Sequence, residues 1–207
     1  MIKKIMTIFL WVIHVAAILG IALGYEDFFY PKTPLTMLYL MLMLALWFPV
    51  DHVKKLILFF LCVATGIGVE WIGVHTGWLF GSYSYLENFG VKLDGIPVLI
   101  GVNWGILVFI THEITRDLHT NIWLRAAVGA LLMVFMDYFL EQICAHAGYW
   151  EFTNVAGWLN YACWFVIGYV LQITASLFKL KGDKKIAINL YLVQTLFAVI
   201  LWILITI

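Results

Sequence analysis

Long apolar segments dominate this sequence and limit the folds that it can adopt. Seven segments have about the length of a helix that crosses a bilayer, roughly 17–25 residues. Charged residues make up only 12% of the chain, against about a quarter of an ordinary soluble domain. We therefore predict an integral membrane protein, an all-α transmembrane bundle of about seven helices in a single domain, 1–207. The predicted helices are 5–24, 35–50, 54–75, 96–113, 123–144, 157–178 and 186–206.

The basic residues at the ends of these segments predict the orientation of the bundle. With the N-terminus in the cytoplasm, ten of the 12 Lys and Arg residues fall on the cytoplasmic side. Only Lys32 and Lys92 fall on the outer side, so the positive-inside rule places the C-terminus outside. The net charge of zero gives no indication of a nucleic-acid partner. The inner set is Lys3, Lys4, Lys54, Lys55, Arg116, Arg125, Lys179, Lys181, Lys184 and Lys185.

Three carboxyl side chains within the predicted helices are the strongest functional signal. An ionised carboxylate near the bilayer centre costs roughly 2.5–3.5 kcal/mol on insertion scales, so such groups usually face the bundle interior. From the helical rise, Glu70 lies about 22 Å above the inner face, Asp137 about 18 Å and Glu141 about 24 Å. Asp137 and Glu141 are four residues apart and share one helix face. We expect all three groups at one level in the outer half of the bundle.

The stretch EWIGVHTGWLFGSYSYLENFG starts at Glu70 and runs into the largest predicted loop, 76–95. A loop of this length in a compact protein is often functional. Its aromatic rings, and those that follow Glu141, lie at the level of the acids, and Gly77 and Gly81 permit tight turns. We predict a substrate pocket at this level, lined by Trp71, His75, Trp78, Tyr83, Tyr85, Asn103, Trp104 and Trp150.

Proton transfer to an apolar substrate fits this set of residues. A carboxyl group buried in apolar surroundings favours its protonated form and can serve as a general acid. Protonation of a carbon–carbon double bond gives a carbocation, which the negative faces of aromatic rings stabilise. A second carboxylate can activate the water that captures this cation. The sequence leaves both Asp137 and Glu70 open as the proton donor, with the partner acid and Glu141 positioning or activating water.

Three motifs resemble those of a known family. They are the run E-x-x-G-x-x-T-G-x-x-F-G-x-Y-x-Y from Glu70, then LDGIPVLIGVNW, and then the GYW that follows the helix of Asp137. The pattern, over roughly 66–152, resembles the membrane carotenoid-biosynthesis proteins that include carotenoid 1,2-hydratases such as bisanhydrobacterioruberin hydratase.

The resemblance implies a specific reaction. Water adds across the terminal 1,2 (or 1′,2′) double bond of an acyclic carotenoid end group, giving a tertiary alcohol with no cofactor and no metal. The implied substrate is lycopene, γ-carotene or a bacterioruberin precursor. The implied location is the cytoplasmic membrane of a bacterium or archaeon.

Other function classes stay open on the sequence. A membrane prenyl transferase would use the D-x-x-x-E motif at 137–141 to hold Mg²⁺ against a diphosphate. The sequence offers no second acidic motif and almost no Lys or Arg on the outer face, which disfavours that reading. A non-enzymatic carotenoid or lipid carrier, or a proton-coupled transporter, would also place acids inside a helical bundle.

Overall fold

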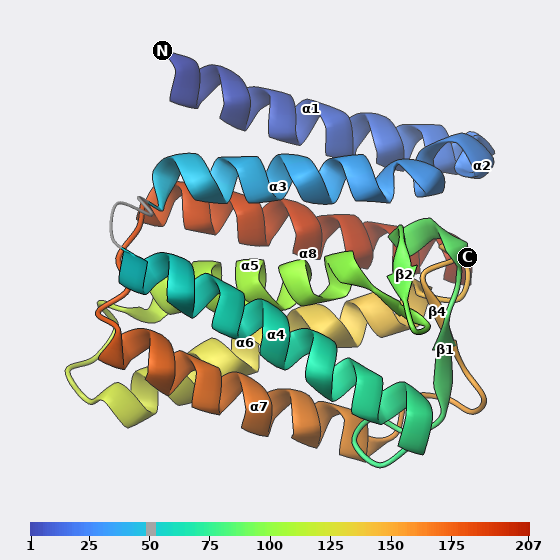
Figure 1. Ribbon diagram of the computed structural model, residues 1–207. Coiled ribbons are helices and arrows are strands. Elements are labelled where there is room, and N and C mark those ends of the chain that lie inside the picture. Colours follow the sequence, from blue (N-terminus) through green and yellow to red (C-terminus); the bar gives the residue numbers. More distant parts are fainter. Residues whose placement is uncertain (49–52) are drawn as a thin grey trace.

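Seven long helices form one bundle in the part of the chain that the computed structural model describes, residues 1–48 and 53–207 (Figure 1). The predicted all-α bundle is confirmed, and the helix boundaries lie within a few residues of those expected. The predicted end of the second helix, at Pro49 and residue 50, lies outside the described residues. The helices are α1 (Ile2–Ala22), α3 (Thr33–Trp47), α4 (Val53–Thr76), α5 (Val98–Thr115), α6 (Ile122–Ile143), α7 (Trp158–Leu177) and α8 (Lys184–Thr206).

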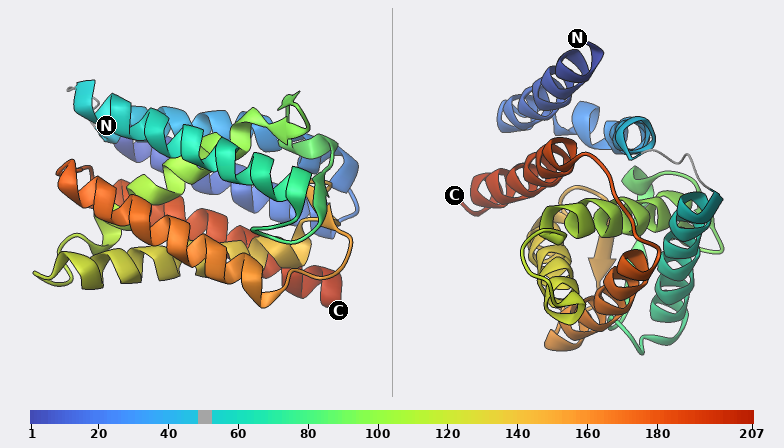
Figure 2. Two further views of the ribbon diagram at one scale, coloured as in Figure 1. Left: turned by 60° about the horizontal axis from the view of Figure 1, so that its bottom comes forward. Right: turned by 90° about the vertical axis from the view of Figure 1, so that its left-hand side faces the viewer.

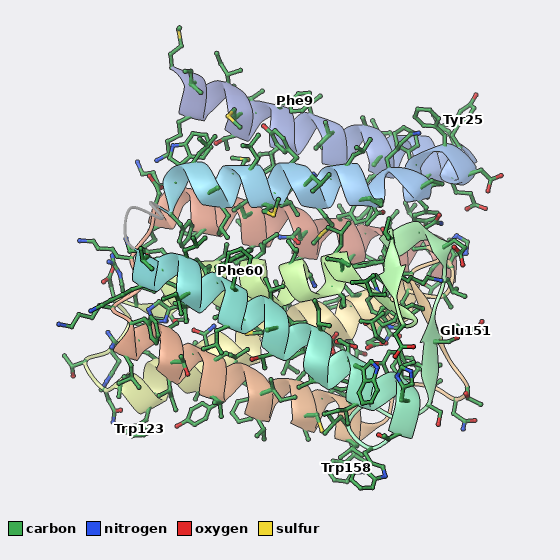
Figure 3. All side chains as sticks on the ribbon, in the orientation of Figure 1. Phe9, Tyr25, Phe60, Trp123, Glu151 and Trp158 are labelled. Carbon is green, nitrogen blue, oxygen red and sulfur yellow. The ribbon has the colours of Figure 1, made fainter. Side chains whose placement is uncertain are left out.

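The composition of these helices makes the protein an integral membrane protein. Six helical stretches among the described residues are long and apolar enough to cross a bilayer. One of them, Glu26–Trp47, joins α3 to the short helix α2 (Glu26–Phe29) and the 3-10 turn η1 (Tyr30–Lys32), neither of which the sequence predicted. The seventh long helix, α7, is not one of these six and packs along α6. Large apolar side chains such as Phe9 and Phe60 are more than half exposed, as lipid-facing residues are (Figure 3).

The two ends of the bundle differ in charge. The first residues of α1, α4, α6 and α8 and the last residues of α5 and α7 lie at one end, which carries the ten basic residues of the predicted inner set (Figure 1, left). Lys3 forms an ion pair with Asp183, joining the start of α1 to the start of α8. The Asp183 side chain also caps α8 by accepting from the backbone N–H of Ile186. The chain termini lie at opposite ends of the bundle, and which end faces the cytoplasm stays a prediction.

Two small antiparallel sheets close the opposite end. The predicted loop 76–95 contains β1 (Tyr83–Tyr85), which pairs with β4 (Trp150–Phe152) from the loop after α6. Tyr83 lies opposite Phe152, and Tyr85 lies opposite Trp150. Because side chains alternate along a strand, Tyr83 and Tyr85 point to the same side, into the bundle. The remaining elements are the 3-10 turn η2 (Glu87–Phe89) and the hairpin of β2 (Lys92–Leu93) and β3 (Ile96–Pro97).

Helix α5 lies at the centre of the bundle and α1 at its edge. Of the residues of α5, 83% are buried, because α3, α4, α6, α7 and α8 all pack against this helix. Viewed from the end, α1 stands next to α3 and α8 and away from α4, α6 and α7 (Figure 2). A buried α5 therefore supplies side chains to the interior, whereas α1 forms a lipid-facing border.

Gly66 allows α4 to pack closely against α5. A Cβ atom at Gly66 would lie 2.7 Å from the side chain of Trp104, closer than real contacts allow. We expect Gly66→Ala to lower the free energy of unfolding by about 1–3 kcal/mol, as overpacking does, measured by thermal unfolding in detergent. Gly68→Ala is the matched control on the same helix, because a Cβ there meets nothing within 4 Å. Equal stability of the two variants would contradict this close packing.

Candidate active site

Glu70 accepts three hydrogen bonds inside the protein. Its side chain, near the end of α4, is 4% exposed. Oε2 accepts from the hydroxyls of Tyr83, at 2.5 Å, and Tyr85, at 2.8 Å. Oε1 accepts from the indole Nε1 of Trp104 on α5, at 3.0 Å. Donors to both oxygens suit an ionised carboxylate.

The two tyrosines act as donors over the whole range of physiological pH. Burial raises the pKa of the Tyr83 and Tyr85 phenols well above the ordinary value, and the nearby Glu70 carboxylate adds to the shift. Both rings therefore keep their protons and hold Glu70 in place. Their position follows from strand β1, whose alternation turns both side chains toward α4.

Asp137 and Glu141 share one amide. They lie one turn apart on α6, and Nδ2 of Asn160 on α7 donates to Oδ2 of Asp137 and to Oε1 of Glu141, at 3.2 Å in each case. Glu141 also accepts from Nε1 of Trp150 at 3.0 Å. Asp137 is 1% exposed, and its carboxyl has no second hydrogen-bond donor among the described residues. Of the three acids, Asp137 is thus the one with the fewest donors.

The three acids surround a small buried cavity, the acid cavity. It offers about 20 Å³ to the centre of a water-sized sphere, about enough for one water molecule. Aromatic rings from four segments complete the wall, together with the amides of Asn103 and Asn160. The rings are those of Phe80, Tyr83, Tyr85, Trp150, Phe152 and Trp164. No group of three or more His, Cys, Asp or Glu side chains in residues 1–48 and 53–207 has a geometry suited to a metal ion.

Most of the residues predicted for the pocket meet at this cavity. The three acids line it together with Tyr83, Tyr85, Asn103 and Trp150. Trp104 does not line the cavity but donates a hydrogen bond to Glu70. Trp104 is in turn stacked on Trp164, with ring centroids 3.9 Å apart. The three acids therefore lie at one level of the bundle, as expected from the sequence.

Three predicted pocket residues lie elsewhere, contrary to the expectation. Trp71 follows Glu70 by one residue, and a helix turns by about 100° per residue, so its side chain faces outward and is 44% exposed. Its Nε1 donates to Asp94 at 2.7 Å, and its ring stacks on that of His75. Trp78 is 78% exposed.

Asn160 and Trp164 were missed by the sequence analysis. Asn160 interrupts an apolar helix, so the argument that selected the acids applies to it as well. Trp164 lies four residues later and shares its helix face. Phe80 and Phe152 come from the two loops and carried no comparable signal.

The acid cavity has a polar neighbour at the loop end of the bundle. This open hollow, the loop hollow, lies between the end of α6 and residues 151–156. Glu141 and Phe152 line both spaces, so they form the wall between them. Glu141 is therefore the acid nearest to an aqueous entrance.

Comparison with known proteins places the chain in a family. A family model described as "Carotenoid biosynthesis protein" matches residues 32–207. The chain belongs to this family. The resemblance predicted from the motifs is thus confirmed, and membership of the family supports a carotenoid-modifying role.

A curated relative of this chain has a named activity. Bisanhydrobacterioruberin hydratase of Haloarcula japonica is 29% identical over 116 residues, which are 50% of this chain and 38% of the relative. The match therefore spans little more than a third of that relative's length. No solved structure is significantly similar to the chain.

Proposed function

We propose that this protein is a cofactor-independent carotenoid hydratase. It would add water across the terminal 1,2 (or 1′,2′) double bond of an acyclic carotenoid such as lycopene, γ-carotene or a bacterioruberin precursor. The observation that carries the proposal is the convergence of Glu70, Asp137 and Glu141 on a buried cavity with aromatic walls and room for one water. The relative named as a hydratase supports the same reaction class.

Asp137 is the proton donor in this mechanism. Three carboxyl groups around one cavity repel each other when all are ionised, so a proton is best kept on the group with the fewest donors. Glu70 has three donors and Glu141 has two nitrogen donors, whereas Asp137 has the Asn160 amide alone. The proton moves from Asp137 to C2, the π electrons form the new C–H bond, and C1 becomes a tertiary cation.

The surroundings of the cavity suit a transient positive charge. Aromatic rings, those of Tyr85, Trp150 and Trp164 among them, line the acid cavity and attract cations through their faces. The Glu70 carboxylate, held by its three donors, adds a fixed negative charge. Both features lower the energy of the carbocation without forming a bond to it.

Glu141 supplies the water in this mechanism. Its place between the acid cavity and the loop hollow lets it receive water from the aqueous end. As the water oxygen bonds to C1, its proton passes to Glu141. The shared Asn160 amide keeps Glu141 and Asp137 on one wall of the cavity, so a proton returned through water to Asp137 completes the cycle. The net reaction consumes one alkene and one water.

Isotope incorporation tests the proposal. Membranes from a bacterium that expresses the protein would be incubated with unlabelled lycopene in D₂O, and the pigments would be analysed by liquid chromatography and mass spectrometry. We expect a more polar product heavier by one water, with one carbon-bound deuterium left after the hydroxyl is exchanged back. Its visible spectrum should be unchanged, because the terminal double bond is isolated from the conjugated system.

Two results would contradict the proposal. A hydrated product without carbon-bound deuterium would exclude protonation of the alkene by an exchangeable acid. Unchanged lycopene, γ-carotene and bacterioruberin precursor, with the protein present in the membrane, would favour a carrier. A prenyl transferase would instead require a prenyl diphosphate and lose activity with a chelator of Mg²⁺.

A further inference from the structure

An apolar cavity adjoins the acid cavity and shares no lining residue with the loop hollow. It lies among α1, α3, α5, α6 and α8 and offers about 90 Å³ to the centre of a water-sized sphere. Apolar side chains such as Met37, Leu40 and Phe197 dominate its wall. Asn103 and Leu140 line both this cavity and the acid cavity, so these two side chains lie between the two spaces.

The polar side chains in the wall of the apolar cavity are mostly occupied by the protein itself. Nδ1 of His14 bonds to the carbonyl of Leu10, and the Gln194 amide donates to the carbonyl of Leu190. The Thr36 hydroxyl donates to the carbonyl of Lys32, just before its own helix. Because these polar groups already have hydrogen-bond partners in the protein, they do not need a polar ligand, and the cavity suits an apolar occupant.

The Tyr30 hydroxyl and the Asn103 amide are the exceptions. The Tyr30 hydroxyl is buried without a hydrogen-bond partner among the described residues. The Asn103 side chain is 4% exposed and makes no hydrogen bond to another described residue. It stands where the apolar cavity meets the acids, so it is placed to hold the attacking water or the new hydroxyl group. A buried polar group without a partner is costly, and a ligand that supplies one offsets that cost.

On its other side, the apolar cavity continues into a surface groove between α1 and α3, the helix groove. Ile13, Ala17, Phe29 and Thr36 line both spaces. Its wall includes Phe9, whose ring packs against Tyr39 of α3 with centroids 5.3 Å apart. Since exposed apolar side chains cover α1 and α3, the groove opens toward the hydrocarbon core of the bilayer.

The contacts of α1 with α3 and with α2 leave this groove between two fixed points. Toward the basic end, the Tyr39 hydroxyl donates to the carbonyl of Met6 at 2.9 Å. Toward the loop end, the ring of Phe29 occupies the space beside Gly20, where a Cβ would lie 1.8 Å from it. Between these points the facing residues are small, with Ala17 on α1 and Thr36 on α3.

We propose that the helix groove and the apolar cavity form the binding site for the isoprenoid chain of the carotenoid. The chain enters from the bilayer between α1 and α3, and its end group meets the acids at Asn103 and Leu140. The identity of the occupant rests on the proposed function. Polyene and water then approach the acid cavity from opposite sides, which keeps the aqueous entrance away from the lipid.

Tryptophan substitutions in the groove test the site. Ala17→Trp and Thr36→Trp would be introduced into an Asp137→Asn protein, which should bind substrate without consuming it, and purified from lycopene-producing cells. We expect at least about tenfold less carotenoid per protein, the consequence of an overpacking penalty of about 1.4 kcal/mol or more. Val15→Trp and Leu38→Trp are matched controls, exposed on the same helices and outside both spaces, and should bind like the parent.

A labelling experiment keeps the test independent of the tryptophan variants. Lycopene should slow the maleimide modification of Ala17→Cys but not that of Val15→Cys, with the labelled peptides separated by mass spectrometry from those of the native free cysteines. Equal pigment in groove and control variants, equal labelling at both positions, or a parent without bound carotenoid would overturn the site. Groove-dependent binding with no hydrated product from the wild type would instead leave the site standing and refute the hydratase. Hydration that is insensitive to Ala17→Trp would instead support the hydratase and refute the binding site.

Discussion

Asp137→Asn is expected to reduce hydration of the carotenoid end group by roughly 100- to 10,000-fold, the range that general acid catalysis contributes. The amide has nearly the shape of the acid and can still accept from Asn160, so the fold should persist while the transferable proton is lost. Turnover would be measured by chromatography of pigments from membranes with equal protein content. Thermal unfolding of the purified variant would confirm that the bundle is intact.

Two further variants make this result specific. Asp27→Asn removes an exposed acid on α2, at the same end of the bundle but outside the acid cavity and the loop hollow, and should leave turnover unchanged. Glu141→Gln should lower turnover as well, because water loses its base, while the binding of carotenoid is retained. Wild-type turnover by Asp137→Asn would show that this group is not the acid and would move the assignment to Glu70.

The convergence of the acids was predictable from sequence because membranes make ionisable groups conspicuous. Helix lengths and the distribution of Lys and Arg fixed which end of each helix lies at the basic face. The rise per residue then gave the depth of Glu70, Asp137 and Glu141. The direction in which each side chain points was less accessible. The turn of about 100° per residue already sets Trp71 apart from Glu70, but helix α4 is apolar on most of its surface, so its pattern did not show that Trp71 and His75 lie on an exposed face.

Non-local pairing explains the remaining misses. Strand β1 is three residues long, and its partner β4 lies more than 60 positions later in the chain, so local propensity says little about the pairing. That pairing brings Trp150 and Phe152 beside Tyr83 and Tyr85. Asn160 carries no formal charge and is less costly in a membrane helix than an acid, so the cost of burying a charge did not single it out, although it bridges two of the acids.

Glu70 is expected to contribute to stability as well as to catalysis. Replacing it with Ala leaves the Tyr83 and Tyr85 hydroxyls and the Trp104 indole without their acceptor. Each buried donor left unsatisfied costs about 1–3 kcal/mol, so the free energy of unfolding should fall by roughly 3–9 kcal/mol if none finds a new partner. A loss of that size is comparable with the whole stability of an ordinary domain. Thermal unfolding in detergent would measure it.

A double-mutant cycle separates the two roles of Glu70. Glu70→Gln retains one acceptor oxygen but turns an NH₂ group toward a donor, and Tyr83→Phe removes one of the donors facing Oε2. The double variant should therefore be more stable than the sum of the single effects predicts, by about 0.5–3 kcal/mol. Catalysis should not recover with it, because the fixed negative charge beside the cation is still missing. Additive stabilities would show that the Tyr83 hydroxyl and Glu70 are not coupled, and recovery of turnover would show that Glu70 acts only by holding the loop.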